Sequence, residues 1–139
     1  MPTSIFVNIP VGNLDAAKTF FGKLGFGFNA QFTDDTAACM VIDDTIYFML
    51  LTRPKFAEFT TLPIADARVG TQALYGISRD SRGAVDQIAD AALAAGGAEP
   101  RPFQDHGFMY SRAITDLDGH IWEFIWMDPA FVQPTARAS

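Results

Sequence analysis

The segment DLDGHIWEFIWMD, residues 116–128, places one carboxylate, Glu123, in an otherwise strongly apolar strand. Side chains alternate between the two faces of a strand, so Glu123 shares a face with Ile121 and Ile125, while Trp122 points the other way. Both faces are apolar, as expected when one packs on helices and the other lines a cavity. An ionised carboxylate there is unfavourable unless it is paired or protonated, which suits a general acid or base. The alternative is a structural carboxylate, bonded to a neighbouring strand or to ordered water.

Two further polar side chains are candidates for a site. Gln72 lies near the start of the predicted strand 71–78, on the same face as Leu74 and Gly76. His106 lies in the loop QDHG, where a histidine near a cavity mouth could shuttle protons near neutral pH. A loop histidine is also commonly a plain surface residue, and both interpretations stay open at this point.

Tyr110 and Arg112 share one face of the predicted strand FMYSRAIT. If that face looks inward, they offer a hydroxyl and a cation to a polar or anionic ligand. If it looks outward, Arg112 is a solvated charge at a sheet edge. On the first strand, Asn8 is the polar side chain on the same face as Phe6, so we expect it on the cavity side.

The elements that must position these side chains occur in the same order twice. Alternating apolar residues predict a strand over residues 4–11, and Asn13 and Gly25 bound a predicted helix. Three predicted strands follow, FGFNAQFT, TAACMVID and TIYFMLLT, with a hairpin turn at Asp43 and Asp44. The second half repeats this order: the strand 71–78, a helix between Ser81 and Gly96–Gly97, then AEPRPF, FMYSRAIT and the strand of Glu123.

This internal repeat predicts one β-α-β-β-β unit in each half and an α+β fold class. Neither half can cover its own sheet alone, so we expect a single domain over residues 1–139. Its parts are module one at 4–52, a linker at 53–70, module two at 71–128 and a C-terminal tail at 129–139. The linker carries Phe56, Phe59 and Leu62, which favours packing as a short helix or a lid.

Composition bounds the class of protein. A chain of 139 residues, 49% of them apolar, has the size and content of one globular domain. Its net charge of −6 argues against nucleic acid as a partner. The single cysteine, Cys39, lies in the apolar run AACMVI, which indicates a buried, inert thiol. Without a secretory signal pattern or an apolar run of about 20 residues, the expected location is cytoplasmic, with no membrane partner.

The chain resembles the vicinal oxygen chelate superfamily in its internal repeat and in three segments, VGNLDAAKTFFGKLGF, AALAAGGAE and DLDGHIWEF. That superfamily includes glyoxalase I, extradiol dioxygenases, and the fosfomycin- and bleomycin-resistance proteins. Leu117 stands where the last turn of the family usually has proline. More narrowly, QDHGFMY and DGHIWEFIWMD are similar to the subgroup of predicted lactoylglutathione lyases. The resemblance covers about residues 4–128 and implies curved mixed sheets around a concave cavity, in a homodimer.

The resemblance also implies four strand positions that would hold a divalent metal, namely Phe6, Leu50, Gln72 and Glu123. It further implies that Gln72 approaches Glu123, where its amide could hydrogen-bond the carboxylate instead of holding a metal. Phenylalanine and leucine have no lone pairs to donate, so the usual metal site is disfavoured; a divalent metal elsewhere stays open, and the sequence indicates no other cofactor. We expect instead a small-molecule pocket. Its walls would be Phe6, Phe48, Leu50 and Tyr110, and its polar groups Asn8, Gln72, Arg112 and Glu123.

Three functions follow as hypotheses. In the first, the protein binds a small, partly apolar molecule, with Glu123 as the acid or base of a lyase or isomerase and His106 as its partner. In the second, it binds or sequesters such a molecule without catalysis, as bleomycin-resistance members do. In the third, it is a metal-dependent lactoylglutathione lyase or dioxygenase with a displaced metal site built from Glu123, Gln72 and His106.

Overall fold

The computed structural model describes residues 2–131, so the predicted tail beyond residue 131 lies outside the described residues. The chain forms two compact units. The N-terminal unit runs to Gln72 and includes the turn Leu117–Gly119. The C-terminal unit comprises residues 73–116 and those from His120 onward. The boundary at residue 72 lies one residue after the predicted start of module two.

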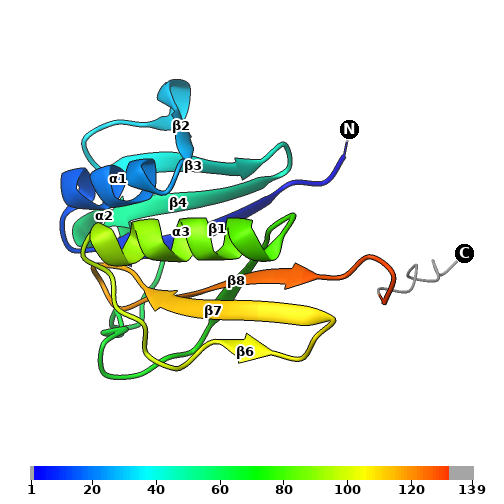
Figure 1. The fold of residues 1–139 in the computed structure, drawn as a ribbon. Coiled ribbons are helices and arrows are strands. Elements are labelled where there is room, and N and C mark those ends of the chain that lie inside the picture. Colours follow the sequence, from blue (N-terminus) through cyan, green and yellow to red (C-terminus); the bar gives the residue numbers. More distant parts are fainter. Residues whose placement is uncertain (1, 132–139) are drawn as a thin grey trace, which may run out of the picture. The chain divides into compact units, whose positions relative to one another are not determined.

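The N-terminal unit holds a four-stranded mixed sheet. Its elements in chain order are β1 (Ile5–Val11), α1 (Leu14–Lys23), β2 (Gly27–Asn29), a 3-10 turn (Ala30–Phe32), β3 (Ala37–Asp43), β4 (Ile46–Thr52) and α2 (Arg53–Ala57) (Figure 1). The strand order is β1-β4-β3-β2, in which β1 and β4 are parallel and the other pairs antiparallel.

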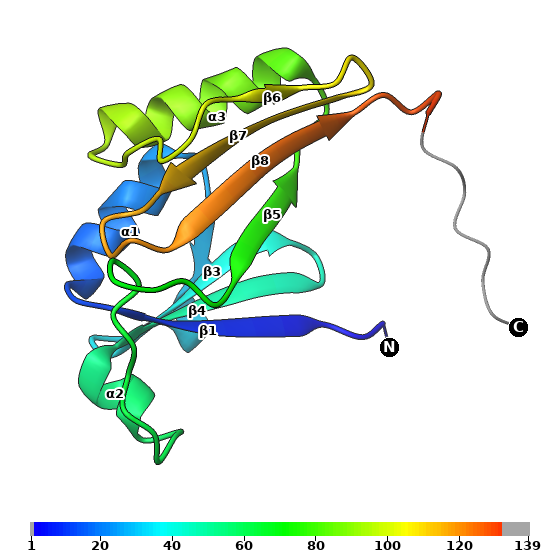
Figure 2. The same cartoon turned by 90° about the horizontal axis from the view of Figure 1, so that it is seen from below.

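The C-terminal unit repeats this plan. Its elements are β5 (Leu74–Ser78), α3 (Arg82–Ala94), β6 (Gln104–Asp105), β7 (Met109–Thr115) and β8 (Ile121–Met127) (Figure 2). The strand order is β5-β8-β7-β6, again with the first pair parallel and the others antiparallel. The two sheets therefore have the same topology, which confirms the predicted repeat and the α+β class.

The long helices begin and end where the sequence predicts. The Asn13 side chain accepts a hydrogen bond from the Ala16 N–H (3.0 Å), and the Ser81 hydroxyl accepts one from the Ala84 N–H (3.0 Å). Gly25 and Gly96 follow the helices with φ of 101° and 109°, a left-handed conformation that favours glycine. Each helix buries one apolar stripe on its own sheet, namely Leu14, Ala17, Phe20 and Phe21 of α1 and Val85, Ile88, Ala89 and Ala92 of α3.

Three strand predictions are wrong in their bounds. β5 begins at Leu74, three residues later than predicted, so Gln72 precedes the strand. AEPRPF forms no strand: Ala98 alone pairs with Thr115, and prolines at 100 and 102 have no N–H for a ladder. The second β strand of that half is instead the two-residue β6, inside the predicted loop QDHG. FGFNAQFT is extended only over β2 and then turns into the 3-10 turn.

Hydrogen bonds to the Asp116 carboxylate stabilise the turn before β8. Asp116 is buried, and its carboxylate accepts hydrogen bonds from the Trp122 indole N–H and the His120 backbone N–H, both at 3.0 Å. Gly119 has a φ of 91°, and a Cβ there would lie 3.0 Å from the Arg68 backbone nitrogen. The turn thus requires glycine, and His120 belongs to its framework rather than to the face of Glu123.

Candidate functional site

Helix α1 packs on one face of the N-terminal sheet and not on the other. Ile9, Phe48 and Leu50 lie on one face and are at most 3% exposed, because α1 packs there. The parallel register pairs Phe6 with Tyr47 and Asn8 with Met49, which places these side chains on the opposite face. We call this second face the open face of the N-terminal sheet.

Phe48 and Leu50 therefore cannot line a pocket with Phe6, and their predicted role as pocket walls is wrong. They belong to the hydrophobic core beneath α1. Phe6 itself is 56% exposed, and its ring stacks on Tyr47 with centroids 4.9 Å apart. The predicted pairing of Asn8 with the face of Phe6 is confirmed.

A hollow of about 360 Å³ lies on the open face, where α2 and the following loop approach the sheet. Asn8 and Leu51 line it from β1 and β4, and Phe56, Phe59 and Thr60 line it from α2 and the loop. We call it the Asn8 hollow. The Asn8 amide nitrogen makes a long 3.4 Å hydrogen bond to the Phe6 carbonyl, while its Oδ1 has no partner among residues 2–131. The hollow is thus an apolar space with one amide open to a ligand.

The sequence of the linker explains why α2 forms at this place. The Thr52 hydroxyl caps the helix by accepting a hydrogen bond from the Lys55 N–H, and Pro54 stands in the first turn, where it has no N–H to leave unpaired. The Lys55 ammonium lies 5.5 Å from the centre of the Phe59 ring. The predicted short helix in the linker is confirmed, and it supplies aromatic side chains to the hollow.

In the C-terminal unit, Glu123 lies on the sheet face away from α3. Trp122 and Phe124 on either side of it are at most 2% exposed and pack toward the helix. Across the sheet, Glu123 is in register with Gly76 on β5 and Ala113 on β7. The predicted alternation of this strand is confirmed, since its carboxylate and its tryptophan face opposite ways.

Arg101 is the partner of Glu123 and was not predicted. Its Nη2 donates a 2.5 Å hydrogen bond to Glu123 Oε2, with 31% of the arginine side chain and 23% of the glutamate side chain exposed. Glu123 Oε1 has no partner among the described residues and, unlike Arg101 Nη1, is not a fully buried unpaired atom. The carboxylate is therefore held as an ion pair with one oxygen still available.

Among the described residues, Glu123 makes no side-chain hydrogen bond to either of the two groups predicted to assist it. Gln72 is exposed and precedes β5, and the carboxylate is bonded to Arg101 instead. His106 lies in the turn after β6, where its N–H donates to the Met109 carbonyl. Ala113 is the β7 residue opposite Glu123, and Met109 lies four residues along β7 from it. About 13 Å of strand therefore separates Met109 from Ala113. The backbone contact of His106 is thus with the far end of β7 from Ala113, and its partner role and the displaced metal site stay predictions.

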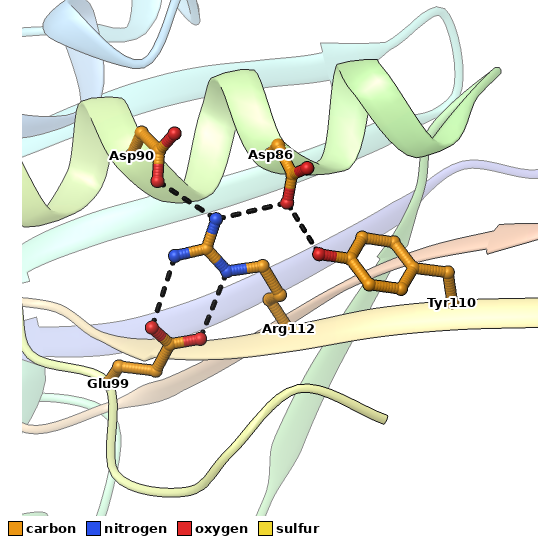
Figure 3. Close-up of polar contacts among 5 residues, drawn as sticks. All are labelled: Asp86, Asp90, Glu99, Tyr110 and Arg112. Atoms are coloured by element: carbon orange, nitrogen blue, oxygen red, sulfur yellow. Dashed lines mark hydrogen bonds and ion pairs between the residues drawn. The ribbon is translucent and has the colours of Figure 1, made fainter. Parts of the chain in front are cut away.

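Tyr110 and Arg112 lie on the helix side of β7 and belong to an internal network (Figure 3). The guanidinium donates to Asp86 (3.1 Å) and Asp90 (2.9 Å) of α3. It also binds both carboxylate oxygens of Glu99, at 3.0 and 3.1 Å. Only 12% of the Arg112 side chain is exposed, so it is neither a solvated edge charge nor a group on the Glu123 face.

This network shifts the pKa of its members. Hydrogen bonding to Glu99 raises the pKa of Arg112, with Asp90 and Asp86 adding to the effect. Burial, together with the hydrogen bond that its hydroxyl donates to Asp86 (2.6 Å), raises the pKa of Tyr110 to about 12. Both groups hold one protonation state near neutral pH, which suits a structural clamp between α3 and β7.

Comparison with known proteins agrees with this fold. Residues 3–43 match the family model described as bleomycin resistance protein-like N-terminal. No curated protein matches the chain. Among solved structures, hypothetical protein SA1046 from S. aureus is 21% identical and has a TM-score of 0.77, with 91% of this chain and 94% of that chain covered.

Two other solved structures are similar to the chain and carry names of the expected superfamily. A glyoxalase-related enzyme from Fulvimarina pelagi is 18% identical, with a TM-score of 0.76 and coverage of 91% of this chain and 88% of that chain. A lactoylglutathione lyase from Agrobacterium tumefaciens is 16% identical, with a TM-score of 0.66 and coverage of 91% and 95%. The match over residues 3–43 is to a bleomycin resistance protein-like model, and the solved structures show that the chain has the fold of these glyoxalase-related proteins.

The side chains at the implied metal positions do not fit a divalent metal. Phe6 and Leu50 have no donor atoms, and Leu50 is fully buried on the α1 side of its sheet. Glu123 is already paired with a guanidinium. Among residues 2–131, no group of three or more histidine, cysteine, aspartate or glutamate side chains lies close enough together to hold a metal ion.

Two structural findings complete the comparison with the sequence. Cys39 is 2% exposed, and burial raises the pKa of its thiol, so the predicted buried thiol is confirmed. None of the helices in the described part of the chain combines the length and apolar character needed to cross a membrane.

Proposed function

We propose that the protein binds a small, partly apolar molecule in the Asn8 hollow, without a metal. The observation that carries this proposal is the hollow itself, with its apolar walls and one unused amide oxygen. Its volume of about 360 Å³ falls at the lower end of the roughly 300–1,000 Å³ typical of small-molecule sites. The site suits an aromatic fragment more than a large ligand.

The lining residues define the chemistry of recognition. Phe56 and Phe59 offer ring faces and edges to a planar apolar group. The Asn8 amide can accept from, and with a small rotation donate to, a polar substituent. A neutral aromatic amide combines both features and is therefore the probe of choice.

The proposal is tested with benzamide and indole in a two-dimensional ¹H–¹⁵N NMR titration. We expect saturable shifts of the Asn8 side-chain amide and of the backbone amides of Leu51 and Phe59. Phe59→Ala should weaken binding several-fold, because it removes one wall. Phe32→Ala is the matched control: Phe32 is also exposed (58%, against 69% for Phe59) and lies outside the hollow. Equal effects of the two substitutions, or shifts that do not saturate, would overturn the proposal.

A second candidate function is proton transfer by Glu123, favoured by its unpaired Oε1. In this role Glu123 would act as a base that removes a proton next to a carbonyl and then returns one, through the oxygen that Arg101 leaves unbonded. Hydroxyacetone in D₂O tests this, because removal of the α-proton and return of a deuteron are visible by NMR. Exchange no faster than that of the Glu123→Gln variant would rule the base role out for this substrate class.

A further inference from the structure

The Glu123 carboxylate is flanked by the two smallest side chains in its row of the sheet. Its neighbours in register are Gly76 and Ala113, so no long side chain of β5 or β7 stands beside it. Gly76 is exposed. Along β8, Ile121 and Ile125 lie on the same face, one on either side of Glu123. The carboxylate is thus a polar group in an apolar surrounding, and its flank at Gly76 is left uncovered by its own sheet.

The ion pair fixes this carboxylate without using up its hydrogen-bonding capacity. Arg101 bonds one oxygen, Oε2, at 2.5 Å. Oε1 remains an acceptor, and the Nη1 nitrogen of Arg101 is a buried donor with no partner among the described residues. The pair as a whole is neutral, so a neutral polar group fits it better than a second full charge.

We propose that the Arg101–Glu123 pair is a binding site for the hydroxyl group of a small apolar molecule whose body lies over Gly76. A hydroxyl is donor and acceptor in one atom, so it can donate to Glu123 Oε1 while its oxygen accepts from the guanidinium. The ring or alkyl body would contact Ile121 and Ile125. Arg101 thereby supplies the positive charge of the site from within the chain. This site is independent of the Asn8 hollow.

The test compares phenol with anisole, which keeps the ring and the oxygen but lacks the donor. In a ¹H–¹⁵N NMR titration of the full chain, both would shift the backbone amides of Gly76 and Glu123. We expect phenol to bind about tenfold more tightly or better, as a hydrogen bond to a charged acceptor implies. Glu123→Met should abolish this preference. Equal affinities of phenol and anisole for the unmodified protein would overturn the proposal.

A steric variant keeps the test decisive if Glu123→Met fails to fold. A Cβ at Gly76 would meet only the flexible tip of Ile125, at 3.4 Å, so Gly76→Val changes the space beside the carboxylate and leaves the ion pair in place. It should weaken phenol binding about tenfold or more. Ser78→Val, two residues along the same face of β5, is the matched control and should leave binding nearly unchanged. Phenol shifts that persist in Gly76→Val, or that occur at Asn8 and Phe59 instead, would contradict the assignment.

Discussion

Arg82 and Asp105 are joined by two parallel hydrogen bonds, of 2.7 and 2.9 Å, between the first turn of α3 and the end of β6. The guanidinium also lies 5.3 Å from the ring centre of Tyr110 and 5.0 Å from that of Trp126. It donates a further hydrogen bond to the Gly107 carbonyl. One arginine therefore fastens the turn between β6 and β7 to the helix and to the sheet.

The pair makes stability depend on pH. Hydrogen bonding to Arg82 lowers the pKa of Asp105 to about 2, from an ordinary value of 3.8. Because the folded pKa is the lower one, the contribution is fully present above about pH 4 and is lost as the pH falls through about 2. In urea unfolding, the unmodified protein should be more stable than Asp105→Asn at pH 6, and the difference should shrink between pH 4 and pH 2. A constant difference across this range would contradict the assignment.

Removal of the Arg112 charge should lower the free energy of unfolding far more than removal of any one of its acidic partners. Arg112→Met leaves Asp86, Asp90 and Glu99 close together without their cation. We expect a loss of about 2–3 kcal/mol in the free energy of unfolding, below the value for a fully buried pair because the carboxylates are partly exposed. The control is Asp90→Asn, which removes the most exposed partner (68%) and should cost little. Chemical denaturation of both variants measures the contrast.

Two glycines should respond in opposite ways to alanine. At Gly97, a Cβ would lie 2.6 Å from the Thr115 carbonyl oxygen, a backbone atom that cannot move aside cheaply. Gly97→Ala should therefore destabilise the protein by about 1–3 kcal/mol. At Gly22 in α1, nothing lies within 4 Å of the added atom, and alanine favours the helix by roughly 0.5–1 kcal/mol. Thermal unfolding should show a lower midpoint for the first variant and a higher one for the second.

Leu50 and Phe6 provide a test of which face of the N-terminal sheet is core. Leu50→Ala opens a cavity in a site with no exposure and should cost about 2–5 kcal/mol. Phe6→Ala removes an exposed ring and its stacking on Tyr47, and should lower the free energy of unfolding by about 1 kcal/mol or less. Urea unfolding compares them directly. Similar losses for both would show that the open face is packed as tightly as the core.

The features predicted from the sequence are those with local causes. Asn13 and Ser81 cap their helices because the cap and the N–H groups it serves are three residues apart. The alternation around Glu123 holds because a single strand determines which side chains share a face. The repeat of elements was predictable for the same reason, since each helix and most strands carry their own pattern.

The errors come from relationships that no local pattern contains. β4 is apolar on both faces, so only its register with β1 shows that Tyr47, and not Phe48 or Leu50, accompanies Phe6. Arg101 reaches Glu123 across 22 residues, and Arg112 reaches Asp86 across 26. The segments EPRPF and FMYSRAIT do not indicate which carboxylate each arginine pairs with, because the partner depends on the sheet and helix around the arginine.

The two prolines that prevent a strand at residues 99–103 also limit the freedom of Arg101 in the unfolded chain. Pro100 has a fixed φ, and Pro102 confines the arginine before it to extended conformations. Less backbone entropy is lost when such a segment settles over the sheet. The restricted backbone therefore favours the position of Arg101 beside Glu123 in the free protein. A ligand would not have to order this arginine when it binds.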